Sequence, residues 1–145
     1  MMFETSAFFT TNTATNDHLK FDTVLFKTSG STLALDTTSP YITGPGASVG
    51  RITLPANRKF FLRYLLQDFT GTGLITDQSF FITWYNATSG SPLGYVHTNT
   101  LVDRSLYFSS ASIVVGASPI VVEARITYSK QIIGYKAFGE VEEFT

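Results

Sequence analysis

Residues 59–66, KFFLRYLL, decide the fold class. Successive side chains of a β-strand point to opposite faces. One face of this strand would hold an apolar set typical of a core: Phe60, Leu62, Tyr64 and Leu66. The other face would mix cations with large apolar groups: Lys59, Phe61, Arg63 and Leu65. Because a large apolar patch is rarely left in water, this second face predicts a contact between subunits.

Two later runs alternate in the same way. Residues 79–86, SFFITWYN, carry aromatic side chains on both faces. Residues 119–128, PIVVEARITY, instead have one apolar core face and one face with Glu123 and Arg125, which would meet solvent or an interface. The strands at 59–66 and 79–86 each have two apolar faces, and one small sandwich cannot bury all four of these faces. The candidate subunit-interface residues are therefore Phe61, Arg63, Leu65, Phe81 and Tyr85.

The composition predicts an all-β protein. Hydrophobic residues make up 43% of the 145 residues and charged residues only 14%, against about a quarter in typical domains. Ser and Thr together number 35, and Thr, Val, Ile, Phe and Tyr suit pleated, half-buried surfaces. Short runs bounded by turn residues predict eight to ten strands, at 19–26, 32–36, 40–43, 50–54, 59–67, 79–86, 93–98, 105–115, 119–128 and 132–141. The expected fold is an antiparallel two-sheet jelly-roll sandwich.

The chain is predicted to form one domain preceded by an arm. Residues 18–145 contain all the strand patterns, without an internal repeat or a linker. Residues 1–17 are rich in Thr and Asn and are predicted to be an arm. Phe3, Phe8 and Phe9 make this arm apolar enough to dock on a neighbour or a shell.

Composition also narrows the partners and the location. The net charge of −1 gives no reason to expect nucleic acid, which requires clustered Lys and Arg. No run approaches the roughly 20 apolar residues of a membrane helix, so membrane insertion is not expected. The first residues lack the basic and apolar segments of a secretory signal, which predicts synthesis in a cytoplasm.

Catalytic and metal-binding patterns are weak. Without Cys, and with His18 and His97 outside any spaced pair, the sequence predicts no metal site and no cofactor. His18 and His97 are each expected to be hydrogen-bonded structural residues. A glycosidase-type carboxylate pair stays open because it depends on distances in the fold. No nucleophile elbow, phosphate-binding glycine loop or dinucleotide fingerprint occurs, so the chain is predicted not to be an enzyme.

Two binding interpretations stay open beside these. Arg51, Arg58, Lys59 and Arg63 lie close in sequence, either as an anion or acidic-partner site or as the cations of interface salt bridges and a solvated strand end. A receptor or glycan is an alternative partner through the loops at 70–78 and 86–92. The aromatic residues near these loops would stack on a sugar or belong to the core: Trp84, Tyr85 and Tyr95.

Three stretches resemble the tumour-necrosis-factor-like jelly-roll family, which includes the globular heads of complement's recognition component. They are LKFDTVLF (19–26), TLPANRKFFL (53–62) and YKAFGEV (135–141), in the order expected for the family. The resemblance implies a tight homotrimer that buries aromatic strand faces between protomers. Small Ser- and Thr-rich versions without cysteine are common among capsid-decorating, cement and fibre-head proteins of viruses.

The expected function is therefore that of a non-enzymatic structural protein of a virion, acting as a homotrimer. Its expected partners are itself and a major capsid or fibre protein, and its expected location is the virus particle. A receptor- or glycan-binding head is the alternative, and a secreted ligand of the tumour-necrosis-factor type is the weaker one.

Overall fold

The computed structural model describes residues 1–7, 16–40, 48–67, 79–93, 99–100, 105–128 and 136–144. These residues contain twelve strands and no helix. The strands are β1 (Met2–Glu4), β2 (Asn16–His18), β3 (Thr23–Phe26), β4 (Leu35–Pro40), β5 (Ser48–Leu54), β6 (Lys59–Gln67), β7 (Ser79–Asn86), β8 (Pro92–Leu93), β9 (Asn99–Thr100), β10 (Ser105–Val114), β11 (Ile120–Tyr128) and β12 (Lys136–Phe144). Within these ranges there is no helix long and apolar enough to cross a membrane.

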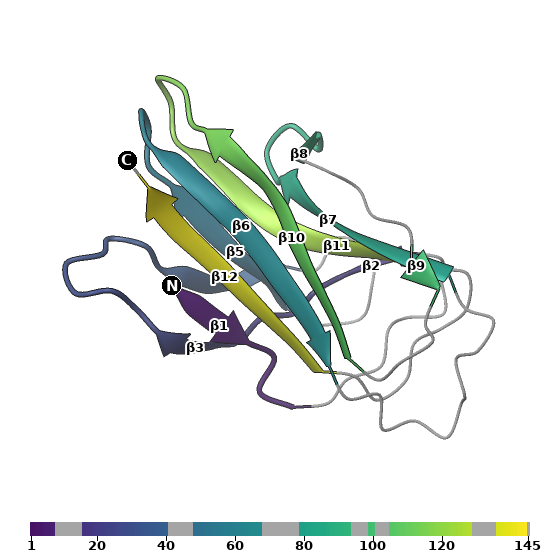
Figure 1. The fold of residues 1–145 in the computed structure, drawn as a ribbon. Helices are drawn as coiled ribbons and strands as arrows, with labels where there is room; N and C mark the ends of the chain where they lie inside the picture. The colour runs from purple at the N-terminus through teal and green to yellow at the C-terminus, as the bar shows by residue number, and fades with distance from the viewer. Residues whose placement is uncertain are drawn as a thin grey trace.

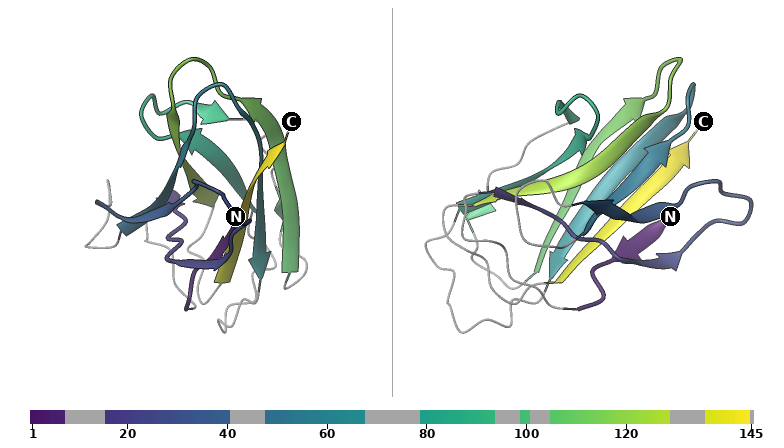
Figure 2. Two further views of the ribbon diagram at one scale, coloured as in Figure 1. Left: turned by 90° about the vertical axis from the view of Figure 1, so that its left-hand side faces the viewer. Right: turned by 180° about the vertical axis from the view of Figure 1, so that it is seen from behind.

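The strands form two antiparallel sheets (Figures 1 and 2). Sheet I has the order β10-β6-β12-β1-β3, and sheet II has the order β4-β5-β11-β7-β8, with β2 beside β11 and β9 beside β7. The chain passes repeatedly between the sheets, so that β5, β6 and β7 lie in sheets II, I and II. The prediction of an all-β, antiparallel two-sheet jelly-roll sandwich is confirmed, but the described residues contain twelve strands where the sequence predicted eight to ten.

Residues 59–67 form β6, an inner strand of sheet I between β10 and β12. Phe60, Leu62 and Tyr64 point into the sandwich and are buried, as the period-2 pattern predicts. The hydroxyl of Tyr64 donates a hydrogen bond to the carbonyl oxygen of Ile82 in β7, at 3.0 Å. Because β7 belongs to sheet II, this bond joins the two sheets inside the core.

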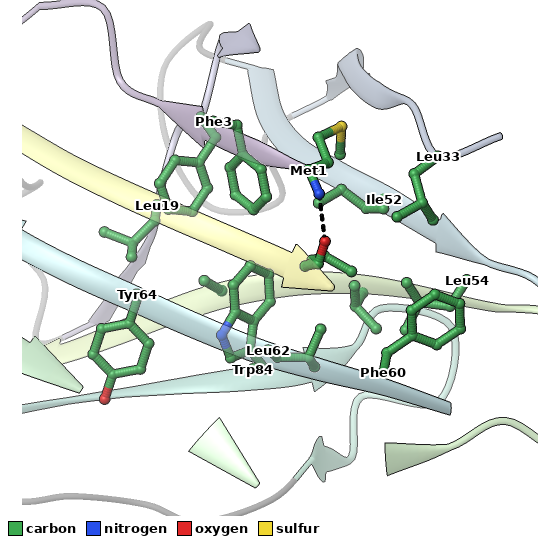
Figure 3. Packing of buried hydrophobic residues seen from close by; sticks show 14 of the residues in the cluster. Met1, Phe3, Leu19, Leu33, Ile52, Leu54, Phe60, Leu62, Tyr64 and Trp84 are labelled. Carbon is green, nitrogen blue, oxygen red and sulfur yellow. Dashed lines mark hydrogen bonds between the residues drawn. The ribbon is translucent and has the colours of Figure 1, made fainter. Parts of the chain in front are cut away.

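The core is filled by side chains from both sheets (Figure 3). Its largest members are aromatic: the ring centroids of Phe3 and Phe21 lie 4.7 Å apart, and those of Phe3 and Trp84 lie 6.1 Å apart, both edge to face. Gly139 of β12 lies directly under the Phe3 ring, where an added Cβ would overlap Phe3 Cε2. The absence of a side chain at Gly139 therefore makes room for the Phe3 ring.

The expected N-terminal arm needs a correction at Phe3. Residues 2–4 form β1, which pairs with β12 on one side and β3 on the other, and Phe3 is fully buried in the core. Residues 5 and 6 are also fixed, because the backbone N–H of Ala137 donates to Thr5 Oγ1 and Ser6 donates to both Asp22 carboxylate oxygens. Phe3 is thus not available to contact a shell. Phe8 and Phe9 lie outside the described residues.

Candidate functional site

A group of polar side chains gathers on the outer face of sheet II. Val122, Ala124 and Ile126 of β11 point into the core, so Glu123 and Arg125 point to the opposite face. The sheet register then adds two residues from β7 and one from β2. Tyr85 of β7 pairs with Glu123, and both Thr83 of β7 and His18 of β2 pair with Arg125. Together with Arg51 of β5, these residues are called the Glu123 cluster below: His18, Arg51, Thr83, Tyr85, Glu123 and Arg125.

Glu123 is the centre of this cluster. Its side chain is fully buried, although it lies on the face that the sequence predicts to meet solvent or an interface. Arg51 Nε donates to Oε2 at 2.9 Å, and Arg125 donates to Oε1 from Nε at 3.0 Å and from Nη2 at 2.7 Å. His18 Nε2 lies 3.4 Å from the same Oε1. A buried carboxylate is stable only when it is paired in this way.

These contacts fix the charge of Glu123. Burial alone would raise the pKa of its carboxyl, but the contacts with His18, Arg125 and Arg51 outweigh burial and lower the pKa to about 2. Glu123 is therefore ionised across the neutral range and does not supply a general acid there. No group of three or more possible metal ligands occurs among the described residues.

Acid should weaken the fold through this carboxyl. Its pKa of about 2 in the folded protein lies below the ordinary value of 4.5, so its stabilisation is complete above about pH 5 and is lost as the pH falls towards 2. We expect the free energy of unfolding to fall by about 1.4 kcal/mol per pH unit from this group within that window. Urea denaturation at pH 7, 5 and 3 measures the effect, and equal stability at pH 5 and pH 3 would contradict it.

Two sets of contacts hold the residues of the cluster in position. The guanidinium carbon of Arg125 lies 4.3 Å from the ring centroid of Tyr85, so the ring supports the plane of the cation. β2 is fixed by the backbone N–H of Leu19, which donates to the carbonyl oxygen of Ala124 at 2.9 Å. Asp17 Oδ1 accepts from the backbone N–H of His18 at 2.7 Å. The cluster is thus built from rigid strand positions rather than from a loop.

On the outer face of sheet I, Phe61 is partly covered by Phe144. The ring of Phe61 stacks on that of Phe144 in β12, with centroids 4.4 Å apart. The guanidinium of Arg63 lies 5.4 Å from the Phe61 ring, and its Nη1 is 3.6 Å from Glu140 Oε2. Phe61 is half-buried by residues of its own chain, and Arg63 has a partner within that chain. A subunit contact at this face stays a prediction.

The other predicted interface residues are placed differently. Tyr85 belongs to the Glu123 cluster on sheet II, so it lies on another sheet from Phe61. Leu65 and Phe81 lie in β6 and β7, but their side chains are outside the described part of the structure. The five predicted residues are therefore not brought together on one face.

Of the four neighbouring cations of the sequence, Lys59 is exposed in β6 and the three arginines separate in space. Arg51 joins the Glu123 cluster, Arg58 Nη1 lies 3.3 Å from Glu143 Oε2, and Arg63 faces Glu140. These three arginines form salt bridges within the chain and not one anion site. Arg125 was not among the predicted cations of such a site, and only the strand order places it near Arg51.

Of the aromatic residues expected to stack on a sugar, Trp84 lies in the core and Tyr85 lies in the Glu123 cluster. Trp84 is fully buried against Phe3 and Phe21, so it belongs to the core and cannot bind a sugar. The loop at 86–92 is described, and its Asn86 side chain accepts hydrogen bonds from the backbone N–H groups of Thr88 and Ser89. Tyr95, His97 and the loop at 70–78 lie outside the described residues.

Comparison with known proteins does not assign the chain to a family. No protein-family model matches the sequence, and no curated protein matches it. Among solved structures, one that is similar is "Arthrobacter globiformis T6 isomalto-dextranse complexed with panose", with a TM-score of 0.29 and 15% sequence identity. The match covers 85% of this chain and 22% of that one. A likeness this distant transfers neither an activity nor a ligand to this chain, and whether the chain is an enzyme is left open by it.

Proposed function

We propose that this chain is a non-enzymatic structural protein of a virus particle, which decorates or cements a capsid or forms a fibre head, and that it acts as a homotrimer. The observation that carries the proposal is an exposed apolar margin of sheet I. Val24, Leu25 and Phe26 are consecutive in β3 and are 44%, 48% and 60% exposed, and Met2 beside them is 42% exposed.

The position of this apolar margin favours self-association. β3 is the last strand of sheet I among the described residues, so its outer edge has no strand partner there. Edge strands of monomeric proteins are usually protected by charged residues, proline or a bulge, because an open apolar edge pairs with other chains. Within β3 no residue is charged and none is proline, although its pairing with β1 shifts register at Leu25. Burial against further copies of the chain would remove these side chains from water, at about 25 cal/mol per Å² of apolar area.

The rest of the proposal is supported by the fold and by the surface chemistry. A jelly-roll sandwich is the fold that the resemblance of the three sequence stretches implies. The abundance of neutral Ser and Thr suits a surface that packs against a shell more than one that attracts nucleic acid. A carboxylate that stays ionised at the centre of the main polar cluster suits an architectural role better than proton transfer.

The proposal is tested by placing a charge on the margin. We expect the native protein to be a trimer by light scattering at micromolar concentration. Phe26→Lys should give a folded monomer, because each interface would have to bury an unpaired ammonium group. Val114→Lys is the matched control, since Val114 is 72% exposed but lies on β10 at the opposite edge of sheet I. A monomeric native protein, or a Phe26→Lys trimer, would contradict the proposal.

The particle assignment needs a separate measurement. Purified virus particles from the host that makes this protein should carry it after sedimentation through a density gradient, in a fixed ratio to the major capsid or fibre protein. Its recovery only in the soluble fraction would exclude the virion role while leaving the trimer result standing.

A further inference from the structure

The Glu123 cluster contains more hydrogen-bond donors than it uses. An arginine side chain has five N–H groups. Arg51 donates to Glu123 only from Nε. Arg125 donates to Glu123 from Nε and from one N–H of Nη2. Within the part of the chain that the structure describes, the remaining guanidinium N–H groups make no hydrogen bond or ion pair. The side chains of Arg51 and Arg125 keep 19% and 28% of their surface exposed, so solvent reaches them.

A buried hydroxyl lies at the same place. Thr83 is 1% exposed, and its Oγ1 has no hydrogen-bond partner among the described residues. Its residue pairs directly with Arg125 across β7 and β11, on the outer face of sheet II. A buried hydroxyl without a partner lowers stability, so the position of this group is explained if it serves something that is bound only part of the time.

The charges of the cluster favour an anion. Arg51 and Arg125 carry two positive charges and share the single carboxylate of Glu123. Asp36 of β4 lies opposite Arg51 in the sheet register and is exposed. Its Oδ1 accepts hydrogen bonds from the backbone N–H and the hydroxyl of Thr38. The two arginines therefore carry one positive charge more than the Glu123 carboxylate to which both are bonded.

We propose that the outer face of sheet II binds a small carboxylate ligand, with the free N–H groups of Arg51 and Arg125 binding the carboxylate and the Thr83 hydroxyl donating to it. The planar fork of a guanidinium can bind a carboxylate through two parallel N–H···O hydrogen bonds. Arg125 is pre-organised for this role by the Tyr85 ring and by Glu123, which lowers the cost of ordering it on binding. The site does not depend on the proposed assembly, because it lies on the other sheet from β3.

The site can be tested by titrating the full chain with galacturonate and following amide chemical shifts. Galacturonate should bind, and galactose, which lacks the carboxylate, should not. Acetate binding would support the carboxylate clamp without a sugar requirement. Sulfate binding as tight as that of acetate would overturn the assignment to a planar carboxylate, and the absence of shifts with all of these anions would overturn the site.

Variants locate the binding and separate it from folding. Arg51→Gln should weaken galacturonate roughly tenfold or more, the range for a lost hydrogen bond to a charged group. Arg51→Lys keeps the charge beside Glu123 but loses the planar fork, so it should also weaken binding and serves if Arg51→Gln does not fold. Arg58→Gln is the control, since that arginine is exposed and pairs with Glu143 outside the cluster. Equal affinity of Arg51→Lys and the native protein would contradict the clamp.

Thr83 gives the sharpest discrimination. Thr83→Val replaces the unpartnered hydroxyl by a methyl group of similar size, so the ligand-free protein should become equally or more stable to urea. The same change should weaken galacturonate binding severalfold. A structural role alone predicts loss of stability without a change in affinity, and that result would overturn the assignment of Thr83 to the site.

Discussion

Replacement of Glu123 by Gln is expected to lower the free energy of unfolding at pH 7 by on the order of 3 kcal/mol. The change keeps the shape of the side chain but removes the charge that Arg51 and Arg125 share. Two guanidinium groups that are mostly buried would then lack a counter-charge. The amide NH₂ of Gln would also face donors where the carboxylate oxygens now accept. Urea denaturation followed by circular dichroism measures the loss.

A matched variant shows whether burial is the cause. Glu143→Gln removes a carboxylate that also pairs with an arginine, but Arg58 and Glu143 are 49% and 42% exposed. Its effect should stay within about 0.5 kcal/mol, as for other exposed ion pairs. Glu123→Gln should in addition have a smaller loss of stability between pH 5 and pH 3 than the native protein. Equal effects of the two variants would show that Glu123 is not the structural centre of the cluster.

Gly139→Ala is expected to be the second strongly destabilising change, at about 3 kcal/mol. The added Cβ would overlap Phe3 Cε2, so the ring must move. Its movement is restricted, because Phe21 and Trp84 both pack against it. Gly116→Ala is the control: Gly116 is exposed, and nothing lies within 4 Å of an added Cβ. That change should be close to neutral.

A second substitution can relieve the clash. Phe3→Leu removes ring atoms that the methyl group added by Gly139→Ala would meet, so the double variant should lose less stability than the two single variants added together. We expect a coupling of about 1 kcal/mol or more in a double-mutant cycle. Additive losses would mean that the strain of Gly139→Ala is relieved elsewhere in β12.

The sequence predicted the central strands well because their information is local. The alternation within 59–67 and 79–86 indicated both the bounds of β6 and β7 and the core faces of these strands. The prediction failed for residues 2–4, where a three-residue strand has too short a pattern to recognise. β1 exists because β12 and β3 lie on either side of it, and no local pattern shows which strands will be neighbours.

The same limit applies to the polar cluster. The amphipathic pattern of 119–128 placed Glu123 and Arg125 correctly on the face away from the core. It did not predict that Glu123 would be fully buried, because Arg51, His18 and Tyr85 come from three other strands. Phe61 has a related explanation: its ring is partly covered by Phe144, which is distant in the sequence and comes close only through the pairing of β6 with β12.

In sheet I the first strand of the chain, β1, pairs with the last, β12, and this has a consequence for how the chain folds. Thr5 and Ala137, 132 positions apart, bond to each other where β1 meets β12. Contacts of such long range are slow to form, because the intervening chain must first be ordered. During synthesis β1 and β3 have no sheet to join until β12 has been made. Phe3 is therefore in water throughout that interval, which is when the chain is most prone to aggregate.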